Sequence, residues 1–225
     1  MVPRVTTLHI GNKNYSSWSL RPWLALRWGA IAFDETLLRL GEEGHGTQQN
    51  KAVLAVSPSG RVPCLHDGDL IVHDSLAICE WAAERAPALW PEDGDARALA
   101  RAAAAEMHSG FADLRRALPM NIKRRMTRAP DWDDATRRDI ARVISLWSEL
   151  RTRFGGHQPY LFGARTIADA FFAPVAARFR TYAVTLPTAA QAYCETIFAD
   201  DAFKEWERAA EEEVWGLPGA DQVYA

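Results

Sequence analysis

Three serines within four residues, Ser16, Ser17 and Ser19, lie where a polar turn gives way to an apolar helical pattern. Hydroxyl groups at a helix start can stabilise an oxyanion or a thiolate, because the helix N-terminus also favours negative charge. Lowering a thiol pKa by two from its usual value of about 8.5 requires roughly 2.7 kcal/mol. A hydroxyl bond to a charged sulfur supplies about 1.5–3 kcal/mol, and the helix N-terminus adds about 0.3–1 kcal/mol. These serines can therefore hold a thiolate that a bound molecule brings, without acting as nucleophiles.

A second segment with chemical potential runs from Ser57 to Leu65 and is followed by Asp74 and Ser75. Proline cannot donate to a sheet ladder, so Pro63 belongs at the first residue of a strand, at an edge or at a bulge. Such a site suits a cis Val62–Pro63 bond, since cis bonds are almost wholly a proline phenomenon. Val62 would then expose its backbone N–H and C=O towards a ligand. Asp74 or Ser75 can cap the next helix, whose first N–H groups favour an anion.

The first part of the chain alternates strand and helix patterns. The Asp-Gly-Asp turn at 67–69 indicates a hairpin between two short strands. The expected elements are a strand at 6–10, a helix from 17 or 19 to 28, a strand within 31–40, a short helix at 47–54, hairpin strands at 64–65 and 70–72, and a helix from 74 or 75 onward. This order is β-α-β-α-β-β-α.

The second part is predicted to be all helical. Residues 86–94 contain two prolines and a glycine and indicate a linker. Thr166 and Asp169 stand three apart before an apolar run, as in a capping box. Helices are expected at 97–118, 133–154, 166–183, 187–198 and 202–214. We therefore expect an α+β domain at 1–86 followed by an all-α domain at 95–225.

Composition limits the classes of function. The chain has 225 residues, 48% of them hydrophobic, and a net charge of -3, which gives no case for nucleic acid or an anionic membrane. No apolar run approaches the ~20 residues that span a bilayer. Its three cysteines form no CxxC pair, which argues against a metal or dithiol site and suits a reducing compartment. Met1 leads directly into a strand pattern, so we expect no signal peptide, a cytoplasmic location and no metal.

The run from Val62-Pro63 to Asp74-Ser75 resembles the glutathione site of the cytosolic glutathione transferase family. The resemblance implies a thioredoxin-like first domain, glutathione as co-substrate and an electrophile pocket between the domains. It implies that Val62 pairs through its backbone with the cysteinyl part of glutathione. It also implies that Asp74 and Ser75 hold the γ-glutamyl amine and carboxylate, and that the protein is a homodimer.

The segment from Tyr15 to Arg21 looks like the Ser-Ser-Cys-Ser-x-Arg motif of the zeta class, the maleylacetoacetate isomerases. The match places Ser16 on the first serine, the thiolate donor, with Ser17 as the second candidate. Tyr15 is a third candidate, because other classes use tyrosine. Trp18 stands where that class has cysteine, and it could line an apolar pocket beside Tyr15.

Two basic residues are weaker candidates for the glutathione site. Arg61 precedes Val62, and Lys51 lies on the stretch that usually reaches the glycine carboxylate in this family. A solvated surface charge is the alternative interpretation for each of them.

Three functions remain open from the sequence. The first is transfer of the glutathione thiolate to an apolar or anionic small electrophile. The second is glutathione-dependent cis–trans isomerisation of a maleyl diacid. Trp18 counts against it, and so does Thr181, which stands where the zeta class has a substrate-binding arginine; Arg178 and Arg180 are out of register. The third is a glutathione- or ligand-binding protein without turnover.

Overall fold

A four-stranded mixed sheet forms one side of the protein in a computed structural model that describes residues 5–41 and 50–224. The strands are β1 (Thr6–Gly11), β2 (Asp34–Leu38), β3 (Cys64–Asp67) and β4 (Leu70–His73). Their spatial order is β2-β1-β3-β4, with β1 parallel to β2 and antiparallel to β3, and β3 antiparallel to β4.

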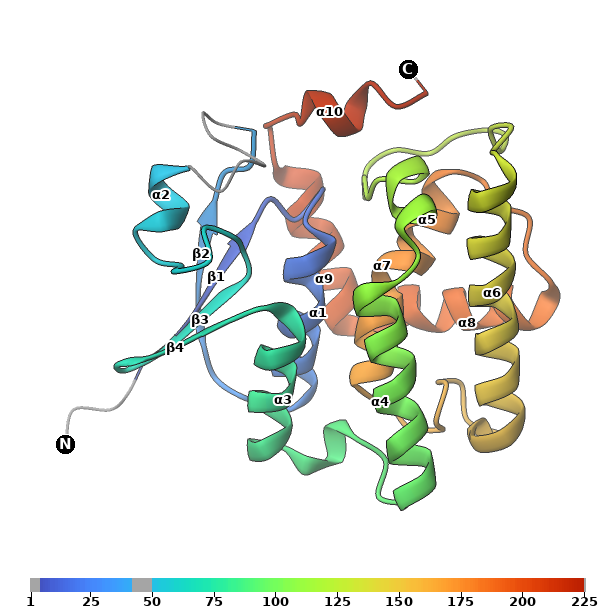
Figure 1. Cartoon of the computed structure of the whole chain (residues 1–225), viewed down its shortest axis with the longest axis horizontal. Helices are drawn as coiled ribbons and strands as arrows, with labels where there is room; N and C mark the ends of the chain where they lie inside the picture. The colour runs from blue at the N-terminus through green and yellow to red at the C-terminus, as the bar shows by residue number, and fades with distance from the viewer. Residues whose placement is uncertain (1–4, 42–49, 225) are drawn as a thin grey trace.

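Three helices accompany this sheet. They are α1 (Ser17–Trp28), α2 (Lys51–Leu54) and α3 (Ser75–Arg85). Figure 1 shows α1 and α3 between the sheet and the rest of the molecule, with α2 towards the opposite side. The β-α-β-α-β-β-α order expected from the sequence is confirmed. The short helix expected at 47–54 begins at Lys51 in the described part, and residues 47–49 lie outside the described residues.

The second half is helical, as predicted. Its elements are η1 (Pro87–Leu89), α4 (Gly94–Ser109), α5 (Ala112–Ala117), α6 (Asp134–Leu150), η2 (Arg151–Gly155), α7 (Ile167–Thr181), α8 (Thr188–Ala199), α9 (Asp201–Glu212) and α10 (Pro218–Asp221). Helix α10 was not expected from the sequence, and it lies near the top of Figure 1 between the two halves.

The prediction of a single helix at 97–118 is wrong, because the helix is interrupted at Gly110. The Gly110 N–H bonds to the Glu106 carbonyl and ends α4, and a Cβ at Gly110 would lie 2.7 Å from that carbonyl oxygen. Phe111 then takes a left-handed conformation, with φ at 55°. The alanine-rich sequence on both sides hides this break, since helix formers continue beyond it. The break redirects α5 relative to α4.

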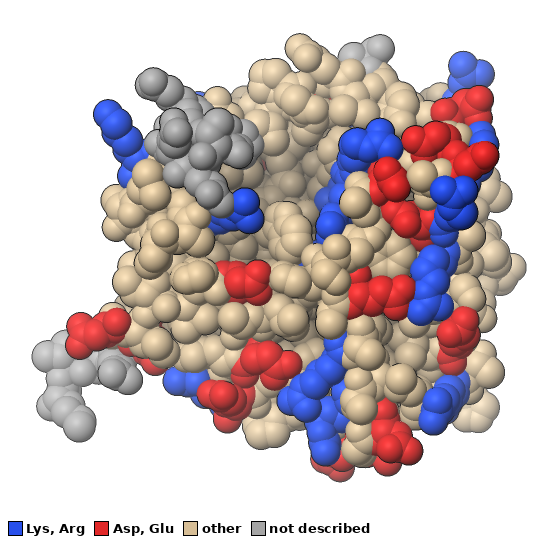
Figure 2. Space-filling model, viewed as in Figure 1, with Lys and Arg blue, Asp and Glu red and all other residues tan. Residues whose placement is uncertain are grey.

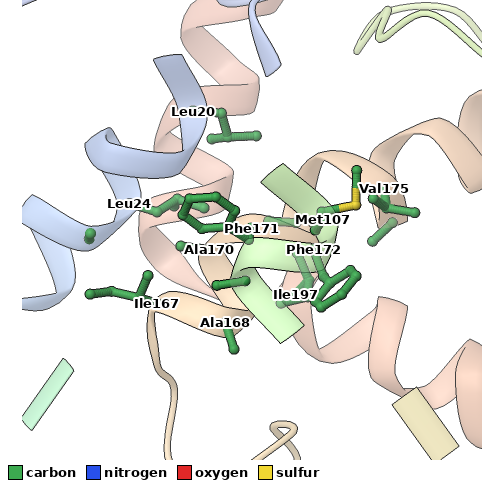
Figure 3. Close-up of a cluster of buried hydrophobic side chains, with 14 of the residues drawn as sticks. Leu20, Leu24, Met107, Ile167, Ala168, Ala170, Phe171, Phe172, Val175 and Ile197 are labelled. Atoms are coloured by element: carbon green, nitrogen blue, oxygen red, sulfur yellow. The ribbon is translucent and has the colours of Figure 1, made fainter. Parts of the chain in front are cut away.

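Helix α7 is the central element of the core. Figure 3 shows Phe171 and Val175 of α7 packed among Leu24 of α1, Met107 of α4 and Ile197 of α8. These contacts join the sheet-bearing half to the helical half through one continuous apolar core.

The capping box predicted at the start of α7 is confirmed. The Asp169 carboxylate accepts bonds from the Thr166 N–H at 2.8 Å and the Thr166 hydroxyl at 3.0 Å. It also accepts from the Leu161 N–H at 3.1 Å and the Tyr193 hydroxyl at 3.0 Å. Asp169 therefore ties the loop at Leu161 and helix α8 to the buried start of α7.

Within the described ranges, no helix combines the length and apolarity that crossing a bilayer demands. The same ranges contain no group of three or more His, Cys, Asp or Glu side chains placed to hold a metal ion.

Candidate functional site

A cavity of about 750 Å³ lies between the sheet-bearing half and the helical half. Figure 2 shows the molecule hollowed between these halves, with Lys and Arg side chains along one wall of the hollow. Of the predicted site residues, the cavity brings together Tyr15, Ser16, Ser17, Trp18, Arg61, Val62, Pro63, Asp74 and Ser75. Lys51 is exposed and does not line it, whereas the neighbouring Asn50 does.

The serine-rich turn forms one wall of the cavity. Ser16 is the N-cap of α1, and its Oγ accepts the Ser19 N–H at 3.3 Å. Ser17 is the first residue of the helix. Both side chains are nearly buried, yet both line the cavity. The turn therefore presents hydroxyl groups at a helix N-terminus, where negative charge is stabilised.

The Val62–Pro63 bond is cis, as the sequence indicated. Cys64 begins the pairing with β1 and β4, so Val62 precedes the ladder by two residues. Within the residues described, neither the N–H nor the C=O of Val62 has a hydrogen-bond partner. This backbone therefore has a free donor and a free acceptor at the cavity wall, which suits an extended peptide ligand.

The start of α3 forms the adjoining wall. Asp74 caps the helix by accepting the Leu76 N–H at 2.8 Å and the Ala77 N–H at 3.3 Å. Its φ of 84° is strained for a residue with a side chain, and such strain concentrates at functional sites. The Ser75 hydroxyl beside it is buried without a hydrogen-bond partner within the described chain. A buried hydroxyl with no partner is costly, so Ser75 has an unfilled bonding capacity at the cavity.

The helical half contributes three polar residues that the sequence did not identify as site residues: His108 of α4, Arg115 of α5 and Arg178 of α7. His108 Nε2 lies 3.3 Å from Asp74 Oδ2. Burial lowers the pKa of His108, while the nearby Asp74 carboxylate opposes this effect. Arg178 donates to the Ser17 hydroxyl at 2.9 Å. Asp74 is the only acidic side chain among the described lining residues, so this wall is electropositive.

Cationic side chains, and not only apolar groups, contact the Trp18 ring. The Arg21 guanidinium lies 4.3 Å from the Trp18 ring centroid, and the Arg115 guanidinium lies 5.5 Å from it. The His108 ring meets Trp18 edge-on, with centroids 5.4 Å apart. Such contacts fix the indole against the cavity, since cations are attracted to its face.

The C-terminal segment closes the cavity at Tyr15. Leu217 and Ala220 line the cavity, and Asp221 holds this segment in place. The Asp221 carboxylate accepts the Tyr15 hydroxyl at 2.9 and 3.0 Å, and it accepts Asn121 Nδ2 at 3.0 Å. Burial and Asp221 together raise the pKa of Tyr15. The Tyr15 phenol therefore donates its proton to Asp221 of the C-terminal segment. It is a poor candidate for stabilising the thiolate of a ligand as well.

Comparison with known proteins agrees with this architecture. The family profile "Glutathione S-transferase, N-terminal domain" matches residues 15–85, and the profile "Glutathione S-transferase, C-terminal domain" matches residues 133–211. The chain belongs to the glutathione S-transferase family. A glutathione transferase homologue from Burkholderia (BGR1), solved with bound glutathione, aligns with a TM-score of 0.71 at 23% identity. The alignment covers 93% of this chain and 100% of that one, which supports the transferase fold.

Two curated relatives match part of this transferase-family chain. A probable maleylacetoacetate isomerase from Vibrio cholerae serotype O1 is 36% identical over 99 residues, which is 41% of this chain and 46% of that protein. A maleylpyruvate isomerase from Ralstonia sp. is 35% identical over 99 residues, which is 41% of this chain and 45% of that protein. The match thus spans about half the length of these relatives.

Proposed function

We propose that this transferase-family protein binds glutathione and transfers its thiolate to an electrophilic small molecule. The observation that carries the proposal is the buried, unpartnered hydroxyl of Ser75 beside Asp74 at the cavity. A γ-glutamyl carboxylate would satisfy that hydroxyl, and Asp74 would receive the amine. The free backbone of Val62, beside the cis Pro63, would pair with the cysteinyl unit.

The reaction follows from where the sulfur would lie. With the peptide on Val62, the cysteinyl sulfur would face the hydroxyls of Ser16 and Ser17, which line the same cavity at the start of α1. The thiol loses its proton to water, and a serine hydroxyl donates to the resulting thiolate. The thiolate then forms a sulfur–carbon bond while the leaving group departs with its electron pair. Arg61, at the same cavity, and Lys51, outside it, are the proposed contacts of the glycine carboxylate.

The electrophile would lie against the helical wall, beside Trp18 and Tyr15. Arg115 and Arg178 add positive charge to that wall, and this favours an electrophile that carries an anionic group. Glutathione-dependent isomerisation of a maleyl diacid is therefore our second candidate function. In it the thiolate adds to the double bond, the resulting single bond rotates, and elimination restores both alkene and thiolate. The two isomerase relatives support this candidate.

We also propose that the protein is a cytoplasmic homodimer of two-domain subunits, with the domains at 1–86 and 95–225. Both parts supply cavity residues, which supports a site built between two domains. Strand β4 is an edge strand whose Leu70 and Ile71 are 44% and 43% exposed, which supports a covered face. The three cysteines are free and buried, which supports a reducing compartment. Sedimentation that gives a monomer mass would contradict the dimer.

Two assays on the purified protein test the function. Calorimetry with reduced glutathione should give saturable heat, and no heat at millimolar glutathione would contradict the proposal. Turnover is then compared for a simple aryl halide and a maleyl diacid, each with and without glutathione. Conjugation of the aryl halide supports the transferase, and faster isomerisation of the diacid supports the second candidate. Binding without turnover of either substrate would favour a binding protein.

A further inference from the structure

The two serines at the start of α1 use their hydroxyl protons differently. The Ser16 hydroxyl donates to Ser19 Oγ at 2.7 Å, and Ser19 Oγ also accepts the Gly11 N–H at 3.1 Å. The Ser16 proton is therefore engaged inside the capping network of the helix. To donate to a sulfur, Ser16 would have to break this bond.

The Ser17 proton is available. Ser17 Oγ accepts a bond from Arg178 Nη2 at 2.9 Å, and no residue in the described ranges accepts the Ser17 proton. A hydroxyl whose oxygen receives a bond from a cation is a stronger donor, because bonds in a chain polarise one another. Ser17 also lines the cavity, so a ligand can meet its proton.

Arg178 is positioned to act on this hydroxyl. It is buried in α7, and its Nη1 donates to the carbonyl oxygens of Leu118 and Arg115. Within residues 5–41 and 50–224 no carboxylate forms a salt bridge with Arg178, so no carboxylate of these residues neutralises its charge. Burial lowers the pKa of Arg178 to about 10; Tyr182 opposes this shift and Arg115 adds to it, and the guanidinium remains charged at neutral pH.

We infer that Ser17 donates to the glutathione thiolate and that Arg178 is a positioning residue, which directs the Ser17 proton into the cavity and adds its positive charge near the sulfur. This inference rests on the proposed function. It makes the site dependent on both halves, since Ser17 and Arg178 are 161 residues apart in the chain. It also selects Ser17 over Ser16, which the zeta-class match favoured.

The test is the pKa of the bound thiol, measured from the ultraviolet absorbance of the thiolate as the pH is varied with saturating glutathione. Ser17→Ala should raise this pKa by about 1 to 2, because a hydrogen bond to a charged group is lost. Arg178→Gln should raise the thiol pKa by a similar amount. Arg178→Lys should raise it less, since lysine keeps the positive charge but lacks the planar, forked guanidinium group. Ser16→Ala should raise it by less than Ser17→Ala does, because the Ser16 proton is already donated to Ser19 Oγ.

Arg180→Gln is the matched control. Arg180 lies on the same helix and pairs with Glu207 rather than with the cavity, so its loss should not move the thiol pKa. In the Ser17→Ala background, Arg178→Lys should have no further effect. A rise in Ser16→Ala without one in Ser17→Ala would overturn the inference, as would an unchanged pKa in a folded Arg178→Gln protein.

If the Arg178 variants do not fold, the comparison of Ser16→Ala with Ser17→Ala decides by itself which serine donates to the thiolate. Calorimetry with the parent protein distinguishes a failure of glutathione binding from a wrong assignment of the thiolate donor. Absence of glutathione binding would refute the proposed function. Glutathione binding with the same thiol pKa in the parent and in Ser17→Ala would refute this inference only.

Discussion

Replacing Ser75 by alanine should have opposite effects on the free protein and on its complex with glutathione. In the free protein the Ser75 hydroxyl is buried and unpartnered within the described residues, and an unsatisfied buried polar group costs about 1–3 kcal/mol. Alanine removes that cost and is the better helix former at the start of α3. The free variant should therefore be as stable as the parent or up to about 1 kcal/mol more stable.

The complex should lose affinity. A hydrogen bond to a charged group contributes about 1.5–3 kcal/mol, so the dissociation constant for glutathione should rise by roughly 10- to 150-fold. Calorimetry measures the affinity, and urea unfolding with and without glutathione measures both stabilities. At a saturating glutathione concentration, the stabilisation by the ligand should fall by the same free energy.

The control is Ser109→Ala at the exposed end of α4, where the hydroxyl only bonds back to the Ala105 carbonyl at 3.0 Å. This change should leave the affinity for glutathione unaltered. Unaltered affinity in Ser75→Ala would show that the unpartnered Ser75 hydroxyl does not bind glutathione, contrary to the proposed function.

Three further predictions follow from the contacts of individual side chains. Tyr15→Phe should leave the pKa of the bound thiol unchanged, because the phenol donates to Asp221, while hydrogen exchange at 217–224 should become faster. Asp169→Ala should cost about 3–5 kcal/mol in urea unfolding, because four buried bonds to a carboxylate are lost, and a cost below about 1 kcal/mol would contradict this. Burial and, to a lesser extent, His66 lower the pKa of His9. The unfolded chain therefore binds the His9 proton more tightly, and the free energy of unfolding falls as the pH drops below about 6.5. His9→Gln should make this fall shallower, and an equally steep fall would contradict the assignment.

The wall of the cavity that the sheet-bearing half forms could be predicted because it is encoded locally. The cis Pro63, the cap at Asp74 and the serines at the start of α1 are each set by a few neighbouring residues. Turn and cap chemistry depends on such short spacings, so the sequence shows it directly. The break at Gly110 was missed because alanine-rich runs of helix formers lie on both sides of it.

The opposite wall depends on packing between distant segments. Arg178 bonds to Ser17 across 161 residues, and nothing in the sequence near Ser17 indicates such a pair. One signal could have identified it. Arg178 lies three residues before Thr181, and residues three apart share a helix face, so Arg178 can present a cation one turn from the position where the zeta class has its arginine. Thr181 itself bonds to the carbonyls of Asn121 and Ala177.

A crystal structure of the protein with reduced glutathione would show whether the cavity binds glutathione with its sulfur at α1. We expect the peptide antiparallel to the Val62 backbone, its γ-glutamyl carboxylate on the Ser75 hydroxyl, and its sulfur within hydrogen-bond distance of a serine at the start of α1. A glutathione molecule bound with its sulfur away from α1, or a cavity that stays empty at millimolar glutathione, would contradict the proposed binding mode.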